Sequence, residues 1–253
     1  MEERGANAPV FAAESVVSGH GYRARAMETS LRLMTANLLN GRADPVYLAG
    51  ILDRLQPDLV ITQELGHEAA DVLADRYPHH ALHPEIDHRG RGIASRLEAE
   101  FGEVPLPWRP GLWSRIDVGP RRLVLANVHM RNPIVMPWWS SVRIRGRQVD
   151  ALFQWAKGFV EEGDAVVIAG DMNASPSWPV YRRLVRGWDD LVAASSVESG
   201  ARLRPTWAWR PGWPRLLRID HVFGSGARVV STRVEPMRGS DHAAVVVDLA
   251  FDR

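Results

Sequence analysis

The sequence predicts an α/β (α+β) fold in which helices lie outside mixed β-sheets. Short runs of branched apolar residues are typical of buried strands, and they recur along the chain, most clearly at residues 165–169. Other segments place their apolar residues on one side of a helix, as residues 45–55 do. The expected strands follow helices in some places and other strands elsewhere, which favours mixed sheets over purely parallel ones.

The first part of the chain is expected to form a strand–helix–strand unit and a second helix. The helix at residues 45–55 ends before Pro57-Asp58, because proline does not continue a helix. In order, the expected elements are a strand at residues 31–35, a helix at 45–55, a strand at 59–62, a helix at 66–77, a solvated loop with four histidines at 78–92 and a short strand at 93–96.

The second part of the chain is expected to add a long helix and four more strands. Gly119-Pro120 predicts a hairpin turn, and Val149, Leu152 and Ala156 lie on one side of the long helix. In order, the expected elements are a strand at residues 123–128, a loop with Pro and Trp at 131–141, a helix at 142–160, a strand at 165–169, a helix at 179–184, an irregular segment at 193–212 and strands at 218–223 and 243–249.

The composition is that of a globular chain. Hydrophobic residues make up 45% of the 253 residues and charged residues 24%, so the chain can bury a sizeable core. We expect a loose N-terminal extension at residues 1–30 and a single domain, present as a monomer, at residues 31–253. The absence of cysteine excludes disulfides, thiolate catalysis and cysteine-ligated zinc.

Charge and hydropathy leave several partners open. The formal net charge of +1 neither indicates nor excludes a nucleic-acid-binding protein, because a basic patch can coexist with neutrality. Lys157 is the only lysine, so nearly all the positive charge is on arginine. No apolar run is long enough for a transmembrane helix, and Glu14 interrupts the apolar stretch that a signal peptide would need. These features favour a cytoplasmic location.

Five apolar runs adjoin polar, ionisable residues, and strand ends of this kind are where α/β enzymes place their chemistry. One such junction is unremarkable, but five that carry Asn, Glu, His, Asp-x-Asn and Asp-His are hard to explain by packing alone. The five sets are Thr35-Ala36-Asn37, Gln63-Glu64, Asn127-Val128-His129, Gly170-Asp171-Met172-Asn173 and Gly239-Ser240-Asp241-His242.

Together and in this order, the five sets resemble the endonuclease/exonuclease/phosphatase superfamily, the metal-dependent phosphohydrolases related to DNase I. The resemblance covers residues 31 to 249, and Gly-Asp-x-Asn followed by Ser-Asp-His, with Gln-Glu upstream, is specific as a set. It implies a DNase I-like four-layer α/β/β/α sandwich of two mixed sheets flanked by helices. Residues 31–253 would then form the catalytic domain of a phosphohydrolase that uses Mg²⁺ or Mn²⁺.

The resemblance implies a metal site built from oxygen ligands. Glu64 matches the main protein ligand of the metal, and Mg²⁺ prefers hard carboxylate oxygens. Asn37 would lie beside it and reach the metal, its water or the phosphate, and Asp241 matches a second carboxylate near the metal. Considered alone, Glu64 would be a surface residue in a turn and Asn37 would make an Asx-type turn.

The resemblance also implies the catalytic groups. His129 would donate to a non-bridging phosphate oxygen. Asp171 would orient or deprotonate the attacking water, with support from Asn173. These two residues are two positions apart, so on an extended segment their side chains would point the same way. Asp220 would hold the tautomer of His242, which would contact phosphate or assist the water. The sequence leaves open which residue is the general base.

The implied reaction is a one-step, in-line attack of water on phosphorus, with the metal neutralising the developing charge. Among substrate classes, we place a nuclease or other phosphodiesterase first, a sphingomyelinase-like lipid phosphodiesterase second and an inositol or sugar phosphatase third. A binding protein that kept the fold and lost catalysis would show gaps in the catalytic set, and this sequence has none.

Residues that contact the substrate are indicated less sharply. Arg147 and the pair Thr206-Trp207 match positions that family members use near the site or the substrate. Another segment, which contains Met136 and Trp139, precedes three arginines. Exposed tryptophan beside arginine suits a membrane interface, where a phospholipid headgroup would enter the site, and equally suits stacking on single-stranded nucleic acid. Alternatively, the tryptophans pack and the arginines coat the start of a helix.

Overall fold

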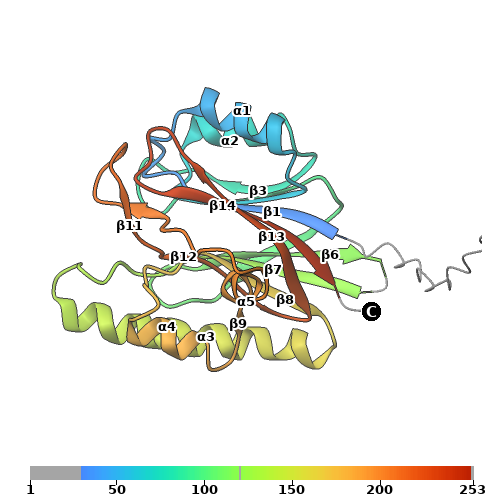
Figure 1. The fold of residues 1–253 in the computed structure, drawn as a ribbon, viewed down its shortest axis with the longest axis vertical. Helices are drawn as coiled ribbons and strands as arrows, with labels where there is room; N and C mark the ends of the chain where they lie inside the picture. Colours follow the sequence, from blue (N-terminus) through green and yellow to red (C-terminus); the bar gives the residue numbers. More distant parts are fainter. Residues whose placement is uncertain (1–29, 120, 252–253) are drawn as a thin grey trace, which may run out of the picture.

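Two six-stranded mixed β-sheets pack face to face in the computed structural model, and helices cover their outer faces (Figure 1). This confirms the four-layer α/β/β/α sandwich predicted from the sequence. The structure describes residues 30–119 and 121–251. Residues 1–29 of the extension expected at residues 1–30, and Pro120 of the expected hairpin turn, lie outside the described residues. Ser30, which was expected in the extension, is the first residue of β1.

The first sheet has the strand order β13-β14-β1-β2-β4-β3, and only β1 and β2 are parallel neighbours in it. Its strands are β1 (Ser30–Asn37), β2 (Leu59–Gln63), β3 (His79–His83), β4 (Arg91–Ser95), β13 (Ala227–Pro236) and β14 (Ala243–Phe251). The helices α1 (Pro45–Leu55) and α2 (His67–Ala74) lie on its outer face, where Leu48 and Leu73 share a buried cluster with Met34.

The second sheet has the order β5-β6-β7-β8-β12-β9, with β7 and β8 parallel. Its strands are β5 (Glu100–Val104), β6 (Gly111–Val118), β7 (Arg121–His129), β8 (Ala165–Asp171), β9 (Asp189–Asp190) and β12 (Asp220–Ser225). The helices α3 (Trp138–Glu161) and α4 (Pro179–Leu184) cover its outer face.

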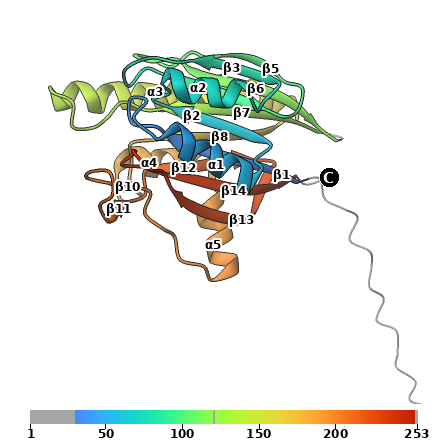
Figure 2. The same ribbon diagram turned by 90° about the horizontal axis from the view of Figure 1, so that it is seen from above.

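Two smaller elements lie outside these layers. The helix α5 (Leu191–Ser199) lies beside β12 and β13 (Figure 2). The strands β10 (Trp207–Ala208) and β11 (Arg215–Leu217) form a separate two-stranded ribbon. Among the helices of the described residues, none combines the length and apolarity needed to cross a bilayer.

The strands at the centre of the sandwich are apolar along their whole length because both of their faces are covered. In β8, Ala165, Val167 and Ala169 belong to the core between the two sheets. Val166 and Ile168 of the same strand belong to the core beneath α3. Such two-sided burial produces the continuous apolar runs that made these strands predictable.

The structure corrects several expected elements. The segment at residues 78–92 is not entirely a loop, since β3 forms an edge strand whose residues all remain partly exposed. The long helix begins at Trp138, so it includes part of the expected loop at 131–141. The irregular segment at 193–212 includes most of α5 and the ribbon strand β10. The strands β5, β6 and β13 were not among the expected elements.

Candidate active site

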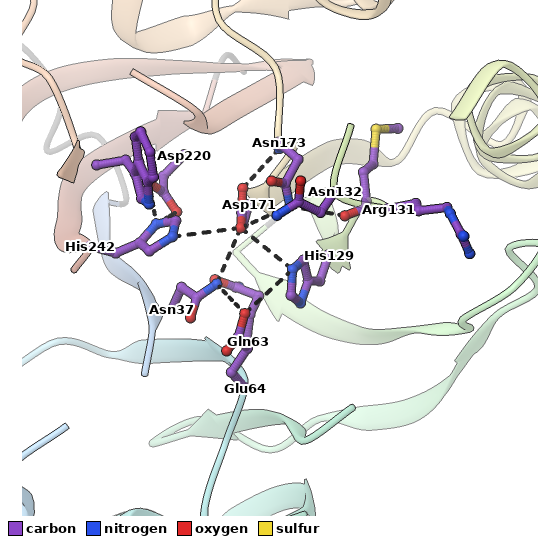
Figure 3. A network of polar contacts seen from close by, with 12 residues as sticks. Asn37, Gln63, Glu64, His129, Arg131, Asn132, Asp171, Asn173, Asp220 and His242 are labelled. Atoms are coloured by element: carbon purple, nitrogen blue, oxygen red, sulfur yellow. Dashed lines mark hydrogen bonds and ion pairs between the residues drawn. The ribbon is translucent and has the colours of Figure 1, made fainter. Parts of the chain in front are cut away.

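Strand ends from both sheets meet at one place and bring the predicted site residues together (Figure 3). Asn37 is the last residue of β1, and His129 and Asp171 are register partners at the ends of β7 and β8. Asp220 starts β12 opposite Asp171, and His242 directly precedes β14. Because β12 and β14 run antiparallel to β8 and β1, their starts reach the edge where the other strands end.

Asp171 lies at the centre of this network. Asn37 donates from Nδ2 to Oδ2 of Asp171 at 3.1 Å and also to Oε1 of Glu64 at 3.1 Å. Burial raises the pKa of Asp171 to about 7, and although His242 opposes this, the negative charges of Asp220 and Glu64 add to it. A carboxylate with such a pKa exchanges a proton near neutral pH.

Asn173 meets Asp171 through a turn. Its backbone N–H donates to Oδ1 of Asp171 at 2.8 Å, and its Nδ2 donates to Oδ2 at 3.1 Å. The φ angle of Asn173 is 47°, in the left-handed region. The expected extended segment is therefore wrong, and the two side chains come together because an Asx-type turn follows the strand.

Glu64 projects from the turn that follows β2. Its Oε2 accepts a hydrogen bond of 2.8 Å from the backbone N–H of Asn40, in the Asn40-Gly41 turn. Its φ angle is 55°, which an L-residue adopts only at a cost. The carboxylate is held by backbone and side-chain donors but still borders the pocket described below.

Unusual backbone conformations cluster at this site. Of the six non-glycine residues described with positive φ, five border the pocket, and the sixth ends α1. The five are Leu39, Asn40, Glu64, Trp108 and Asn173. Backbone strain of this kind persists only where the surrounding structure enforces it, and it gathers at functional sites.

His242 and Asp220 form a buried pair. Nδ1 of His242 lies 2.9 and 3.1 Å from the two carboxylate oxygens of Asp220, so it carries a proton and donates it. Burial alone would lower the pKa of His242, but the charge and hydrogen bond of Asp220 outweigh it and raise the pKa to about 10. Nε2 of His242 lies 3.8 Å from Oδ2 of Asp171.

His129 has a different partner, Arg109, which sequence reasoning missed. Nη1 of Arg109 donates to Nδ1 of His129, which leaves the ring proton on Nε2, 3.4 Å from Oδ2 of Asp171 and 3.7 Å from Oε1 of Glu64. Burial and the charge of Arg109 hold the pKa of His129 well below its usual value, so the ring is neutral. Burial lowers the pKa of Arg109 to about 10, and it remains charged at neutral pH.

A pocket of about 690 Å³ is bordered by most of these residues, namely Glu64, Arg109, His129, Asp171, Asn173 and His242. Asp241 lies in its wall, where Oδ2 accepts a hydrogen bond of 3.1 Å from Nε1 of Trp207. Thr206 is buried and does not border this pocket, and its Oγ1 accepts the backbone N–H of Asp220 at 3.2 Å. The remaining wall is largely aromatic and aliphatic, with Trp108, Ile134, Val135, Trp178, Trp209, Leu217 and Ile219.

Arg147 is exposed on α3 and does not border this pocket. Two neighbours on the same helix contact the site instead. Arg145 donates to the backbone carbonyl of Asn173 at 2.6 Å, and Oε1 of Gln148 accepts the backbone N–H of Arg131 at 3.1 Å. The structure therefore brings together all eight predicted catalytic and metal residues, with Trp207 beside them, and leaves Arg147 outside.

The donor set fits a divalent cation. Asp171, Asp220 and His242 have ligand atoms within 4.8 Å of one another and form a possible metal site among the described residues. Burial is the main cause of the raised pKa of Asp171, and the negative charges of Asp220 and Glu64, which a cation would offset, add to it. Oδ1 of Asp241 is buried and has no hydrogen-bond partner among the described residues, although Trp207 occupies its other oxygen. Asp220 and His242 already hydrogen-bond each other. The carboxylates of Glu64 and Asp241, which border the pocket, are therefore the better candidate ligands.

Comparison with known proteins places these features in a family. A model of the Endonuclease/Exonuclease/phosphatase family matches residues 34–242. No curated protein sequence matches the chain.

Solved structures with the same fold are distant in sequence. An endonuclease/exonuclease/phosphatase from Beutenbergia cavernae has 22% identity and a TM-score of 0.67, covering 88% of this chain and 72% of that one. The human Nocturnin catalytic domain with bound sulfate has 17% identity and a TM-score of 0.69, over 89% and 96% of the two chains. TDP2 from D. rerio, complexed with a single-strand DNA product, has 17% identity and a TM-score of 0.67, over 88% and 99%.

Proposed function

Because the chain belongs to the endonuclease/exonuclease/phosphatase family, we propose that it is a divalent-metal-dependent phosphodiesterase that hydrolyses its substrate by in-line attack of water. One observation carries the proposal: two histidines with opposite charge states both direct Nε2 toward Asp171. His129 is neutral and is held by Arg109, whereas His242 is charged and is held by Asp220. Packing alone does not call for such a pair.

The metal in this proposal is Mg²⁺ or Mn²⁺. Glu64 and Asp241 would hold it, since they offer carboxylate oxygens at the pocket. Asn37 would complete the site only after its amide turned, because its Oδ1 accepts the backbone N–H of Leu39 and its Nδ2 faces Glu64 and Asp171. When bound, the cation supplies positive charge that stabilises the negative charge developing on the phosphate.

Asp171 and the side chains around it accept the proton of the attacking water and stabilise the negative charge on the phosphate. With its pKa raised by burial to about 7, Asp171 accepts the proton of the attacking water. His242 keeps its proton because Asp220 raises its pKa, so it stabilises negative charge rather than acting as a base. His129 donates from Nε2 to a phosphate oxygen, and Asn173 fixes the carboxylate of Asp171.

The shape of the pocket favours a diester over a small monoester. The wall extends beyond the catalytic groups to Trp108, Ile134, Trp178 and Trp209, which leaves room for substituents larger than a bare phosphate. Apolar wall residues would bury the organic group of a substrate rather than bind phosphate oxygens.

The test is hydrolysis of bis-p-nitrophenyl phosphate, p-nitrophenyl phosphate and plasmid DNA with Mg²⁺ or Mn²⁺, and with EDTA as a control. Glu64→Ala and His242→Ala should each reduce turnover of the diester on the order of 10²- to 10³-fold. His83→Ala and Glu85→Ala, which change exposed residues outside the pocket, are the matched controls. Diester hydrolysis that survives both site substitutions, or that EDTA does not reduce, would overturn the proposal.

A further inference from the structure

Two segments that each contribute residues to the pocket wall, residues 131–149 and 201–219, expose large apolar side chains. We call them together the rim. In the first segment, Ile134 and Met136 are 72% and 71% exposed. In the second, Trp209 and Leu216 are 61% and 66% exposed. Single exposed apolar residues are normal on a protein surface, but several that gather at the mouth of one pocket indicate a binding surface.

The rim also has an unusual charge. Its two segments contain nine arginines and no aspartate or glutamate. The whole chain has 31 basic and 30 acidic residues, so the remainder of the chain has 22 basic and 30 acidic residues. Arg145 and Arg218 are buried, whereas the other seven rim arginines are exposed or partly exposed. The arginine of this nearly neutral protein is therefore concentrated in the two rim segments, and Arg131 among them borders the pocket.

Both segments lie at the same end of the molecule in two perpendicular views, one at the start of α3 and the other at the β10–β11 ribbon (Figures 1 and 2). Both also contribute to the pocket wall, the first through Ile134 and the second through Trp209. On α3, Trp139, Arg143 and Arg147 are spaced four residues apart, so apolar and cationic side chains share one side of the helix.

We propose that the rim docks on a membrane that contains anionic phospholipids, and that the substrate is a phosphodiester in a lipid headgroup. Aliphatic and tryptophan side chains enter the boundary between headgroups and acyl chains, and the arginines meet the anionic headgroups. Docking in this orientation places the pocket mouth against the headgroup layer, where lipid phosphodiesters lie. The choice of substrate rests on the proposed hydrolase function, whereas the docking itself does not.

Nucleic acid is the other polyanion that this charge could attract, but the exposed side chains favour lipid. The exposed tryptophans of the rim could serve either ligand, but Ile134, Met136 and Leu216 are flexible or branched aliphatic groups, which do not stack on bases. Trp108, the aromatic residue nearest Arg109 in the pocket wall, already has His88 stacked at 5.8 Å and two guanidinium groups within 5 Å of its ring.

The experiment is sedimentation with vesicles of phosphatidylcholine, with and without phosphatidylserine, in EDTA so that no lipid is hydrolysed. Met136→Ser/Leu216→Ser removes one exposed apolar side chain from each rim segment. The matched control, Val46→Ser/Val197→Ser, removes two apolar side chains from α1 and α5 that are at least as exposed. Wild type should bind the anionic vesicles, the rim variant should bind about tenfold or more weakly, and the control should stay within about twofold of wild type.

Three results would overturn the inference: no binding of wild type to anionic vesicles, equal loss in the rim variant and the control, or rim-dependent binding of labelled single-stranded DNA without vesicle binding. Hydrolysis of soluble bis-p-nitrophenyl phosphate by wild type, measured without vesicles, reports the catalytic proposal separately. Vesicle binding without diesterase activity would therefore keep the docking surface and remove the catalytic proposal.

Discussion

Replacing Arg109 with methionine should slow diester hydrolysis without unfolding the protein. Arg109 is buried, donates from Nη1 to Nδ1 of His129, and its guanidinium lies 4.5 Å above the ring of Trp108. This bond keeps the proton of the neutral imidazole on Nε2, which faces Asp171 at 3.4 Å. Without Arg109, the proton can move to Nδ1, and Nε2 then cannot donate to a phosphate oxygen.

The expected magnitude follows from that one hydrogen bond. A hydrogen bond that involves a charged group contributes about 1.5–3 kcal/mol, which corresponds to a rate reduction of about 10- to 150-fold. Methionine fills much of the same space and removes a buried charge, whose desolvation already lowers the pKa of Arg109 to about 10. We therefore expect the melting temperature to change little.

The assay is steady-state hydrolysis of bis-p-nitrophenyl phosphate by wild type, Arg109→Met and the control Arg182→Met, which changes an exposed arginine on α4. A positioning role lowers kcat, because His129 acts on the transition state, and leaves KM nearly unchanged. Turnover within about twofold of wild type, or an effect on KM alone, would refute this reasoning.

Three further predictions concern the stability contributed by residues in and around the site. The Asp220–His242 pair should stabilise the fold fully below about pH 6.5 and lose this contribution as the pH rises toward 10. The reason is that Asp220 outweighs burial and raises the pKa of His242 from 6.5 to about 10. The difference in melting temperature between wild type and Asp220→Asn should therefore shrink as the pH rises through this range. Asn127→Leu should lower the free energy of unfolding in urea by at least about 2 kcal/mol, because its buried amide makes three hydrogen bonds from β7 to the other sheet. Gly170→Ala should strongly lower the melting temperature, since a Cβ would lie 2.1 Å from a backbone carbonyl oxygen of β7 and the φ angle of Gly170 is 132°. The control Gly158→Ala, in an open position on α3, should be neutral or stabilising.

The fold was predictable where burial is two-sided. The strand β8 is apolar at every core position because one face meets the other sheet and the other face meets α3. The edge strand β3 was missed, since its half-exposed histidines do not form a run that marks a strand. The α1 helix was predicted with its observed ends, because its apolar residues keep helical spacing and Pro57 follows it; the structure adds that Asp44 caps its start.

The site was predictable where a strand end carries the chemistry. The sequence places Asn37, His129 and Asp171 at strand ends. The β7–β8 register pairs His129 with Asp171, and the packing of the two sheets brings Asn37 to Asp171. Arg109 lies in the loop between β5 and β6, and nothing in the sequence distinguishes it from the other arginines. The turn at Asn173 was also missed, because its left-handed φ angle depends on hydrogen bonds to a buried carboxylate.

The most direct test of the central claim is the dependence of diester hydrolysis on metal concentration in wild type and Glu64→Gln, a substitution that keeps shape and removes charge. We expect wild type to show saturable activation by Mg²⁺ or Mn²⁺ that EDTA abolishes. We expect Glu64→Gln to need far more metal and to turn over at least about 100-fold more slowly at low metal. Hydrolysis by wild type without metal, or the same activation curve for both proteins, would contradict the claim that this cluster is a metal-dependent phosphodiesterase site.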